Sequence, residues 1–345
     1  MPSPSARAHS EIYARGVEIA QAAEGMGFDG IWLAEHHFSN YGYLSRPMIM
    51  ATHLAAQTKR IRIGTAVVVL PLHHPLVVAE EAATLDLLSE GRFDLGLGRG
   101  YQQYEFGRMG LDLKDSRSRW EEAIEVLTRA FTEESFSFQG KYFSFPETTA
   151  LPKPYQKPHP PIWVVGQSPE SIDGAVRRGF NVVTGGAAFP VGRIEERRQQ
   201  FDDAVRRHGR EGRLQFGIQQ KIYVTESEEE AVRMAEHGLW NMRVSLSLRL
   251  GREQVERGRV TDVPIEDEPS IEELVDRHFL FGTPDRVSDK LMRLQEKLRL
   301  DHLNCDFWLG EMSQDKVLRS MELFAKHVMP KFQEVPEAEV LSPSG

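Results

Sequence analysis

The chain has 345 residues, and its 42 lysines and arginines against 51 aspartates and glutamates give a formal net charge of -9. This acidic balance argues against a nucleic-acid partner, because basic residues do not gather into a stripe that could follow a phosphate backbone. A single cysteine, Cys305, fits a reducing compartment, and neither a membrane-length apolar run of ~20 residues nor a secretory signal is evident, so we expect a cytoplasmic protein.

The chain opens with a predicted helix over residues 9–26, because apolar residues recur there at helical spacing. Three apolar runs that suit β-strands follow, each ending in polar or glycine residues and each separated from the next by a helix-like segment. They are GIWLA (30–34), IRIGTAVVVL (61–70) and FDLGLG (93–98). Such alternation predicts parallel strands joined by right-handed crossovers, with the chemistry at their carboxyl ends.

The second half of the chain repeats this pattern with one interruption. A helix is expected from 115 to about 131, then a surface hairpin around Gln139 and Gly140, and then further strands. Those strands are IWVVG (162–166), FNVVTG (180–185), LQFGIQQKIYV (214–224) and DHLNCDF (301–307). Residues 240–282 do not fit the repeat, so we expect an insertion on the active face with the character of a partly mobile lid.

Glu35, His36 and His37 follow the first of these strands. A histidine at a strand end can act as a general base, donate a hydrogen bond to a substrate or cofactor oxygen, or bind a metal. It can equally bond a loop carbonyl and have no chemical role. Adjacent residues on one loop rarely converge on one ion and no further ligand cluster is visible, so we predict no metal site.

Arg99 follows the third strand, between Gly98 and Gly100. Small neighbours let an arginine and its backbone approach a phosphate closely, although a surface ion pair is the plain alternative. Ser168 precedes Pro169, and these two residues suit the cap and the first position of a helix. The free amides at such a helix start form an anion site, and capping does not exclude that role.

Three stretches of the chain resemble the luciferase-like flavin-dependent monooxygenases. They are AEHHF, GTAVVVLPLHHPLVVAEEAATLDLLSEGRFDLGLGRGY and PPIWVVGQSPES, and the likeness continues to the last helix. The resemblance implies one α/β domain over residues 1–335, a TIM-type (β/α)8 barrel, with the insertion at 240–282 and a flexible C-terminal tail at 336–345. Members of the family open with a barrel strand before the first helix, so we expect that strand to be absent from this chain.

The resemblance further implies an enzyme that oxygenates a small organic substrate with reduced FMN and O2, through a C4a-peroxyflavin. No glycine-rich nicotinamide fingerprint follows a strand, so a separate NAD(P)H:flavin reductase would supply the reduced FMN. Relatives commonly pair, which predicts a homodimer. Two alternatives stay open: an F420-dependent oxidoreductase on the same barrel, and a non-catalytic flavin-binding relative.

The resemblance also implies roles for particular residues. His36 would be the catalytic histidine, with Glu35 steering its ring. Arg99, Ser168 and Ser171 would hold the flavin phosphate, and the flavin ring would lie beside the bend after the second strand. The predicted cofactor-binding residues are Thr65, Ala66, Arg99, Gly100, Tyr101, Gly166, Gln167, Ser168 and Ser171.

Overall fold

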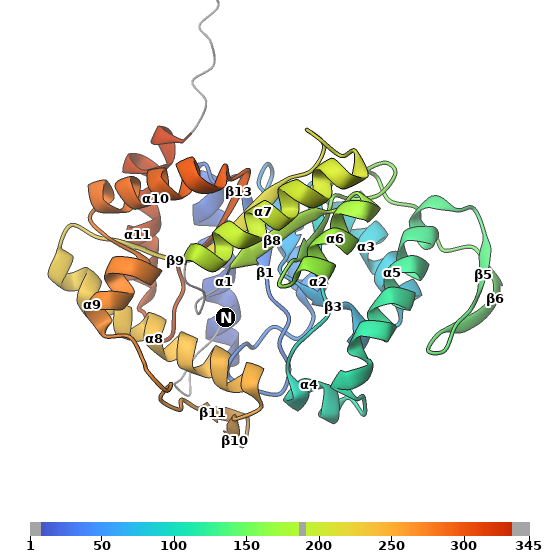
Figure 1. The fold of residues 1–345 in the computed structure, drawn as a ribbon, viewed down its shortest axis with the longest axis horizontal. Coiled ribbons are helices and arrows are strands. Elements are labelled where there is room, and N and C mark those ends of the chain that lie inside the picture. Colours follow the sequence, from blue (N-terminus) through green and yellow to red (C-terminus); the bar gives the residue numbers. More distant parts are fainter. Residues whose placement is uncertain (1–7, 186–190, 333–345) are drawn as a thin grey trace, which may run out of the picture.

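The computed structural model describes residues 8–185 and 191–332, and within them one parallel sheet curls into a barrel surrounded by helices (Figure 1). Its strands follow the order β1, β2, β4, β7, β8, β9, with β13 also paired to β9. Chain order and spatial order therefore agree, as they do when each strand is followed by a helix that returns the chain to the next strand. The predicted α/β barrel is confirmed.

The barrel strands are β1 (Gly30–Leu33), β2 (Arg62–Thr65), β4 (Phe93–Gly98), β7 (Ile162–Val165), β8 (Asn181–Gly185), β9 (Phe216–Val224) and β13 (His302–Asp306). Two short strands extend this sheet: β3 (Val68–Val69) beside β4 and β12 (Leu280–Gly282) beside β9. All six residues of β4 are buried, because a parallel strand in the middle of such a sheet is covered on both faces.

Nine helices of eight or more residues are found in the described part of the chain: α1 (His9–Met26), α2 (Pro47–Gln57), α3 (Pro75–Leu88), α5 (Ser116–Thr132), α6 (Pro169–Arg178), α7 (Val191–His208), α8 (Glu228–Leu250), α10 (Pro284–Leu298) and α11 (Gln314–His327). Proline at the first turn, where its missing N–H costs nothing, begins α2, α3, α6 and α10. None of these helices is both long and apolar enough to cross a membrane.

The shorter elements lie mainly in the loops. They are α4 (Gln103–Arg108), α9 (Ile271–Glu273), the 3-10 turns η1 (Leu70–Leu72), η2 (Leu113–Asp115) and η4 (Met329–Lys331), the π-helical turn η3 (Leu274–His278), and two antiparallel hairpins, β5 (Phe136–Gln139) with β6 (Ser144–Thr148) and β10 (Gln254–Glu256) with β11 (Arg259–Thr261). The β5–β6 hairpin projects beyond α5 at the edge of the molecule (Figure 1).

The barrel interior is filled by aromatic rings at positions that precede the strand ends. Trp32 packs edge to face against Trp163 and His302. A Cβ added at Gly64 would lie 2.4 Å from the Trp32 ring, and one at Gly96 would lie 1.6 Å from the backbone oxygen of Thr65. Glycine is therefore required at both positions by close approach, and the space beside Gly64 belongs to Trp32 rather than to a ligand.

The barrel is nearly closed, with a seam between β1 and β13. Each of these strands has a hydrogen-bonded neighbour on one side, and within the described residues neither has a strand on the other side. Aromatic packing bridges the seam, because Phe28 before β1 contacts both Phe307 after β13 and Phe324 on α11. In the described residues the first element is α1, and β1 follows it.

The predicted insertion, 240–282, contains the second half of α8, the β10–β11 hairpin, α9, η3 and β12, and its last element, β12, pairs with the barrel strand β9. The β10–β11 hairpin packs on α8, because Val255 and Val260 of the hairpin contact a cluster that includes Val244 and Leu248 of α8 (Figure 1). Asn40 anchors the hairpin, because its backbone N–H donates to the carbonyl of Gly258 (2.8 Å) and its side-chain oxygen accepts from the N–H of Val260 (2.8 Å). The predicted tail at 336–345 lies outside the described residues.

Candidate active site

A cavity of about 1140 Å³ opens among the strand ends of the barrel and reaches the seam between β1 and β13. A volume of this size is enough for a cofactor together with a small substrate. Most of the residues predicted from the sequence line this one cavity: Glu35, His36, Ala66, Arg99, Gly100, Tyr101, Gln167, Ser168 and Ser171. Segments that are distant in the sequence therefore meet at a single site.

Two of the predicted cofactor-binding residues, Thr65 and Gly166, lie outside the cavity lining. Thr65 is fully buried, and its hydroxyl donates to the carbonyl of Gly96 (2.8 Å) while accepting from the N–H of the same residue (2.9 Å). Gly166 faces the side chains of Ile172 and Val182, which a Cβ would meet at 2.7 Å. Thr65 therefore joins β2 to β4, Gly166 allows the end of β7 to pack closely against α6 and β8, and neither residue lines the cavity.

The bend after β2 brings Ala66 and Val67 to the cavity wall. The peptide bond between them is cis, the N–H of Ala66 donates to the carbonyl of Leu33 (2.7 Å), and the carbonyl of Val67 accepts from the N–H of Glu35 (3.3 Å). These bonds tie the end of β2 to the end of β1. Ala66 has a small side chain and therefore fills little of the cavity at this bend.

His36 lies in the cavity wall with 17% of its side chain exposed. Its Nδ1 is 3.2 Å from Oε1 of Glu105 and 3.1 Å from Nε2 of Gln102, and its ring packs on that of Tyr41 with centroids 4.4 Å apart. The sequence predicts that Glu35 steers this ring, but the structure places Glu105 there instead. The reason is geometric, because neighbouring side chains on an extended chain point to opposite sides.

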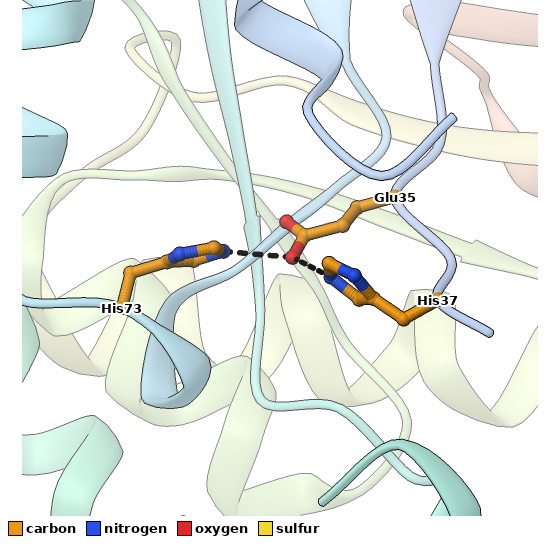
Figure 2. A group of neighbouring side chains, drawn as sticks. All are labelled: Glu35, His37 and His73. Atoms are coloured by element: carbon orange, nitrogen blue, oxygen red, sulfur yellow. Dashed lines mark hydrogen bonds and ion pairs between the residues drawn. The ribbon is translucent and has the colours of Figure 1, made fainter. Parts of the chain in front are cut away.

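The carboxylate of Glu35 lies between His37 and His73 (Figure 2). Its Oε1 accepts from Nε2 of both histidines, each at 2.7 Å, and its Oε2 accepts from the N–H of Val69 at 2.8 Å. Burial alone would raise the pKa of Glu35, but the hydrogen bonds from His37, His73 and Val69 outweigh it and lower the pKa from 4.5 to about 2. Glu35 is thus a buried anion that joins the loop after β1 to the segment from β3 to the residue after η1.

This group resembles the two-histidine, one-carboxylate set that binds metals, since its ligand atoms lie within 4.8 Å of one another. Convergence of Glu35, His37 and His73 was not expected from the sequence. However, Arg46 donates to Nδ1 of His73 at 2.7 Å, so the proton of that ring is on Nε2, which faces Glu35. A metal would need that nitrogen bare, and the hydrogen-bonded arrangement therefore fits better than a metal centre.

The start of α6 forms a polar end of the cavity. Ser168 caps the helix, and the hydroxyl of Ser171 accepts from the N–H groups of Gln167 and Ser168, both at 3.0 Å. Arg99 lines the same cavity with its side chain exposed. Within the part of the chain that the structure describes, it forms no hydrogen bond or ion pair. Hydroxyls, the positive end of a helix and a guanidinium are the groups that bind a phosphate.

The sequence reasoning missed a second arginine at this end. Arg249, from the last turn of α8, lies over the ring of Tyr101 at 4.7 Å from its centroid and also lines the cavity. Arg197 of α7 donates to the carbonyl of Gln167 at 3.4 Å; burial, followed by the charges of Arg193 and Arg249, lowers its pKa. The sequence does contain a basic stretch, RLGREQVERGRV, that begins at residue 249. That stretch could have suggested an anion-binding arginine, but the sequence does not show that the end of α8 lies at this cavity.

Lys221 was also missed, although a lone charge inside the apolar strand β9 is a recognisable signal. It lies opposite Asp306 of β13 in the ladder, with its Nζ 3.3 Å from the carboxylate, and it also bonds the side-chain oxygen of Asn241. All three residues line the cavity. Burial lowers the pKa of Lys221, and the nearby Asp306 opposes that shift.

The family model described as luciferase-like monooxygenase matches residues 2–301 of the chain. Among curated relatives, the oxygenase component of the flavin-dependent trigonelline monooxygenase of Acinetobacter baylyi is 30% identical over 334 residues, covering 94% of this chain and 91% of that protein. An alkanal monooxygenase alpha chain from the Kryptophanaron alfredi symbiont is 35% identical over 173 residues, about half of each chain (50% and 48%).

Solved structures agree on the fold. Monooxygenase RslO1 from Streptomyces bottropensis superimposes with a TM-score of 0.85 at 26% identity, over 96% of this chain and 97% of its own. The oxygenating constituent of 3,6-diketocamphane monooxygenase of Pseudomonas putida, solved with FMN, gives 0.78 at 22% identity, over 96% of each chain. An F420-dependent secondary alcohol dehydrogenase gives 0.74 at 18% identity, over 93% and 96%. The last two likenesses speak for the fold alone.

Proposed function

Because the chain belongs to the luciferase-like monooxygenase family, we propose that it binds reduced FMN and uses it with O2 to oxygenate a small organic substrate. The observation that carries this proposal is the meeting of His36, Ala66, Arg99 and the start of α6 on one cavity. These residues come from four separate strand ends, which is where a barrel of this kind gathers its chemistry.

The polar end of the cavity fits the phosphate of FMN. Arg99 and Arg249 supply positive charge, while Ser168 and Ser171 supply hydroxyls beside the helix start. The flavin ring would then extend along the wall at Ala66 toward His36. When bound, reduced FMN supplies the electrons that activate O2 at its C4a position, and the chain supplies orientation and a site sheltered from bulk water.

His36 would act on protons rather than on electrons. Its Nδ1 faces Glu105 and Gln102, so its Nε2 is the ring nitrogen left for the cavity. An imidazole held in this way can accept a proton from a substrate or cofactor group and return it later. Glu35, bonded to His37 and His73, would support the loop that carries His36 without touching the reacting atoms.

A separate reductase would supply the reduced FMN. The sequence holds no glycine-rich nicotinamide fingerprint, and the trigonelline relative is named as an oxygenase component, which implies a second component. Pairing of two copies of this chain remains a prediction. An F420-dependent hydride transfer is the alternative activity, supported at the level of fold by the alcohol dehydrogenase.

Anaerobic titration separates these two cofactors. We expect photoreduced FMN to bind the protein more tightly than reduced F420, and we expect bound reduced FMN to be reoxidised by O2 with kinetics unlike those of free FMN. In His36→Gln the affinity for FMN should persist, while substrate-dependent oxygen consumption with a flavin reductase should fall by on the order of 100-fold. Tighter binding of F420, or no binding of reduced FMN, would contradict the proposal.

A further inference from the structure

Two side chains from one short segment reach the inner nitrogen of His36. Glu105, on α4, places Oε1 3.2 Å from Nδ1, and Gln102, just before α4, places its side-chain nitrogen 3.1 Å from the same atom. Both side chains are buried, with relative exposures of 2% for Glu105 and 0% for Gln102. Water therefore does not compete strongly for Nδ1, and the protonation of that nitrogen is set by these two neighbours.

The carboxylate requires a proton on Nδ1. If Nδ1 were bare, its lone pair would face a carboxylate oxygen at 3.2 Å in a buried place, and two acceptors at that distance repel. With the proton on Nδ1, the same pair becomes a charge-assisted hydrogen bond. The Oε1 of Glu105 also accepts from the backbone N–H of His37 at 2.9 Å, so the carboxylate is held from two directions.

Gln102 points to the same state. Its side-chain oxygen is buried and has no hydrogen-bond partner within the described part of the chain, while its side-chain nitrogen faces Nδ1. Turning this amide over would place the unpartnered oxygen beside the Nδ1 proton and satisfy it. A bare Nδ1 would accept from Gln102, but it would leave the Gln102 oxygen without a donor and would place its own lone pair against the Glu105 carboxylate, whose Oε1 would keep only the N–H of His37.

We propose that Glu105 is the positioning residue that keeps His36 protonated on Nδ1, so that Nε2 is presented to the cavity as a proton acceptor. The group that His36 binds is therefore a proton donor, such as a hydroxyl, and not a carbonyl or carboxylate oxygen. The catalytic meaning of this state rests on the proposed function, whereas the tautomer itself is a property of the flavin-free protein. The acid beside the histidine in sequence, Glu35, has a different task, because its carboxylate is fully used by His37, His73 and Val69.

The tautomer is measured directly by nitrogen NMR of flavin-free protein labelled with 15N-histidine, in mildly alkaline buffer. The two ring nitrogens of a neutral histidine give well-separated shifts, one typical of an N–H and one of a bare nitrogen. Comparison with His36→Gln identifies the signals of His36. We expect Nδ1 to carry the proton, and any other pattern overturns the proposal.

Variants then test the cause. In Glu105→Gln we expect the Nδ1-protonated form to lose its dominance and substrate-dependent turnover with reduced FMN to fall by about 10- to 100-fold, as for loss of a positioned base. FMN affinity should change by less than about 2-fold, because Glu105 does not belong to the phosphate end. Glu105→Asp should restore part of the Nδ1-protonated form and part of the turnover. Glu125→Gln, which removes an exposed acid on α5 outside the cavity lining, should change neither the tautomer nor the turnover.

These readouts separate the inference from the proposed function. A protein that shows the Nδ1 proton but does not bind FMN would keep the role of Glu105 and refute the flavoenzyme proposal. A protein that binds FMN and reacts with O2, yet carries the His36 proton on Nε2, would support the flavoenzyme proposal and refute the role of Glu105. An unchanged His36 spectrum in a folded Glu105→Gln protein would assign the tautomer to another neighbour and overturn the role of Glu105.

Discussion

Replacing Glu35 with glutamine tests whether a buried charge fastens the loops beneath the site. The pKa of Glu35 lies at about 2 against an ordinary 4.5, because the bonds from His37, His73 and Val69 outweigh the burial that would raise it. A difference of about 2.5 in pKa between the folded and unfolded states corresponds to ~3 kcal/mol of folding free energy, since a difference of one in pKa is worth ~1.4 kcal/mol. We therefore expect Glu35→Gln to lower the free energy of unfolding by at least that order.

The same figure predicts a shift in melting temperature. For a chain of 345 residues the entropy of unfolding is on the order of 0.7 kcal/mol/K, so ~3 kcal/mol lowers Tm by about 4 °C. The folded-state pKa is depressed, so this stability is fully present above about pH 4.5 and is lost as the pH falls toward 2. The difference between wild type and variant should therefore be flat from about pH 7 to 5 and should shrink below that range.

Urea denaturation and scanning calorimetry at several pH values measure both quantities. Glu80→Gln, which neutralises an exposed acid on the nearby helix α3, is the matched control and should leave Tm unchanged. If Glu35→Gln lost less than about 1 kcal/mol at neutral pH, the three bonds would not compensate the buried charge as described. A difference that grew on acidification would contradict the sign of the shift.

Three further substitutions and one treatment have definite expected outcomes. Arg99→Met should weaken FMN binding by ~10-fold or more, because a charge-assisted bond is worth ~1.5–3 kcal/mol, and an unchanged Kd in flavin titration would remove Arg99 from the phosphate site. Gly64→Ala should destabilise the fold by ~1–3 kcal/mol in urea, because its Cβ would lie 2.4 Å from the ring of Trp32; wild-type stability would contradict that packing. Asn40→Ala should speed hydrogen exchange across the β10–β11 hairpin, because the buried N–H of Val260 loses its acceptor, and unchanged exchange would show that other contacts hold the hairpin. Chelation with EDTA should leave Tm unchanged, whereas stoichiometric metal that copurifies and stabilises the protein would refute the hydrogen-bonded account of the Glu35 cluster.

The barrel could be predicted from the sequence because its signals are local. Apolar runs such as FDLGLG, which forms the fully buried β4, each end in glycine or polar residues. Helices that begin at a proline, such as α3, can be recognised from that proline and its immediate neighbours. The Ser168 cap and its place on the cavity follow from the same local chemistry. Parallel strands bring their ends together, so residues chosen one strand end at a time were found on one wall.

The partners of each side chain could not be predicted in the same way. Glu105 lies 69 positions from His36, and nothing local connects them until the barrel closes. The alternation of side chains along an extended segment does argue that Glu35 and His36 face opposite ways, so that part of the error was avoidable. Thr65 is the last residue of β2, directly before the bend at Ala66, and its hydroxyl is bonded to β4 rather than facing the cavity.

Among the residues that the structure describes, no backbone ladder joins β1 to β13, so the barrel wall is interrupted at this one seam. Strands in the middle of the sheet are restrained by ladders on both flanks, whereas this join is held by side-chain contacts such as those of Phe28 with Phe307 and Phe324. Local opening of the barrel should therefore occur mainly at this seam. The backbone amides of β1 and β13 that face the seam should exchange with solvent much faster than those of β4. Because the cavity reaches the seam between β1 and β13, each local opening would briefly connect the cavity to solvent at the side of the barrel. That route is separate from the strand ends where the predicted catalytic residues lie.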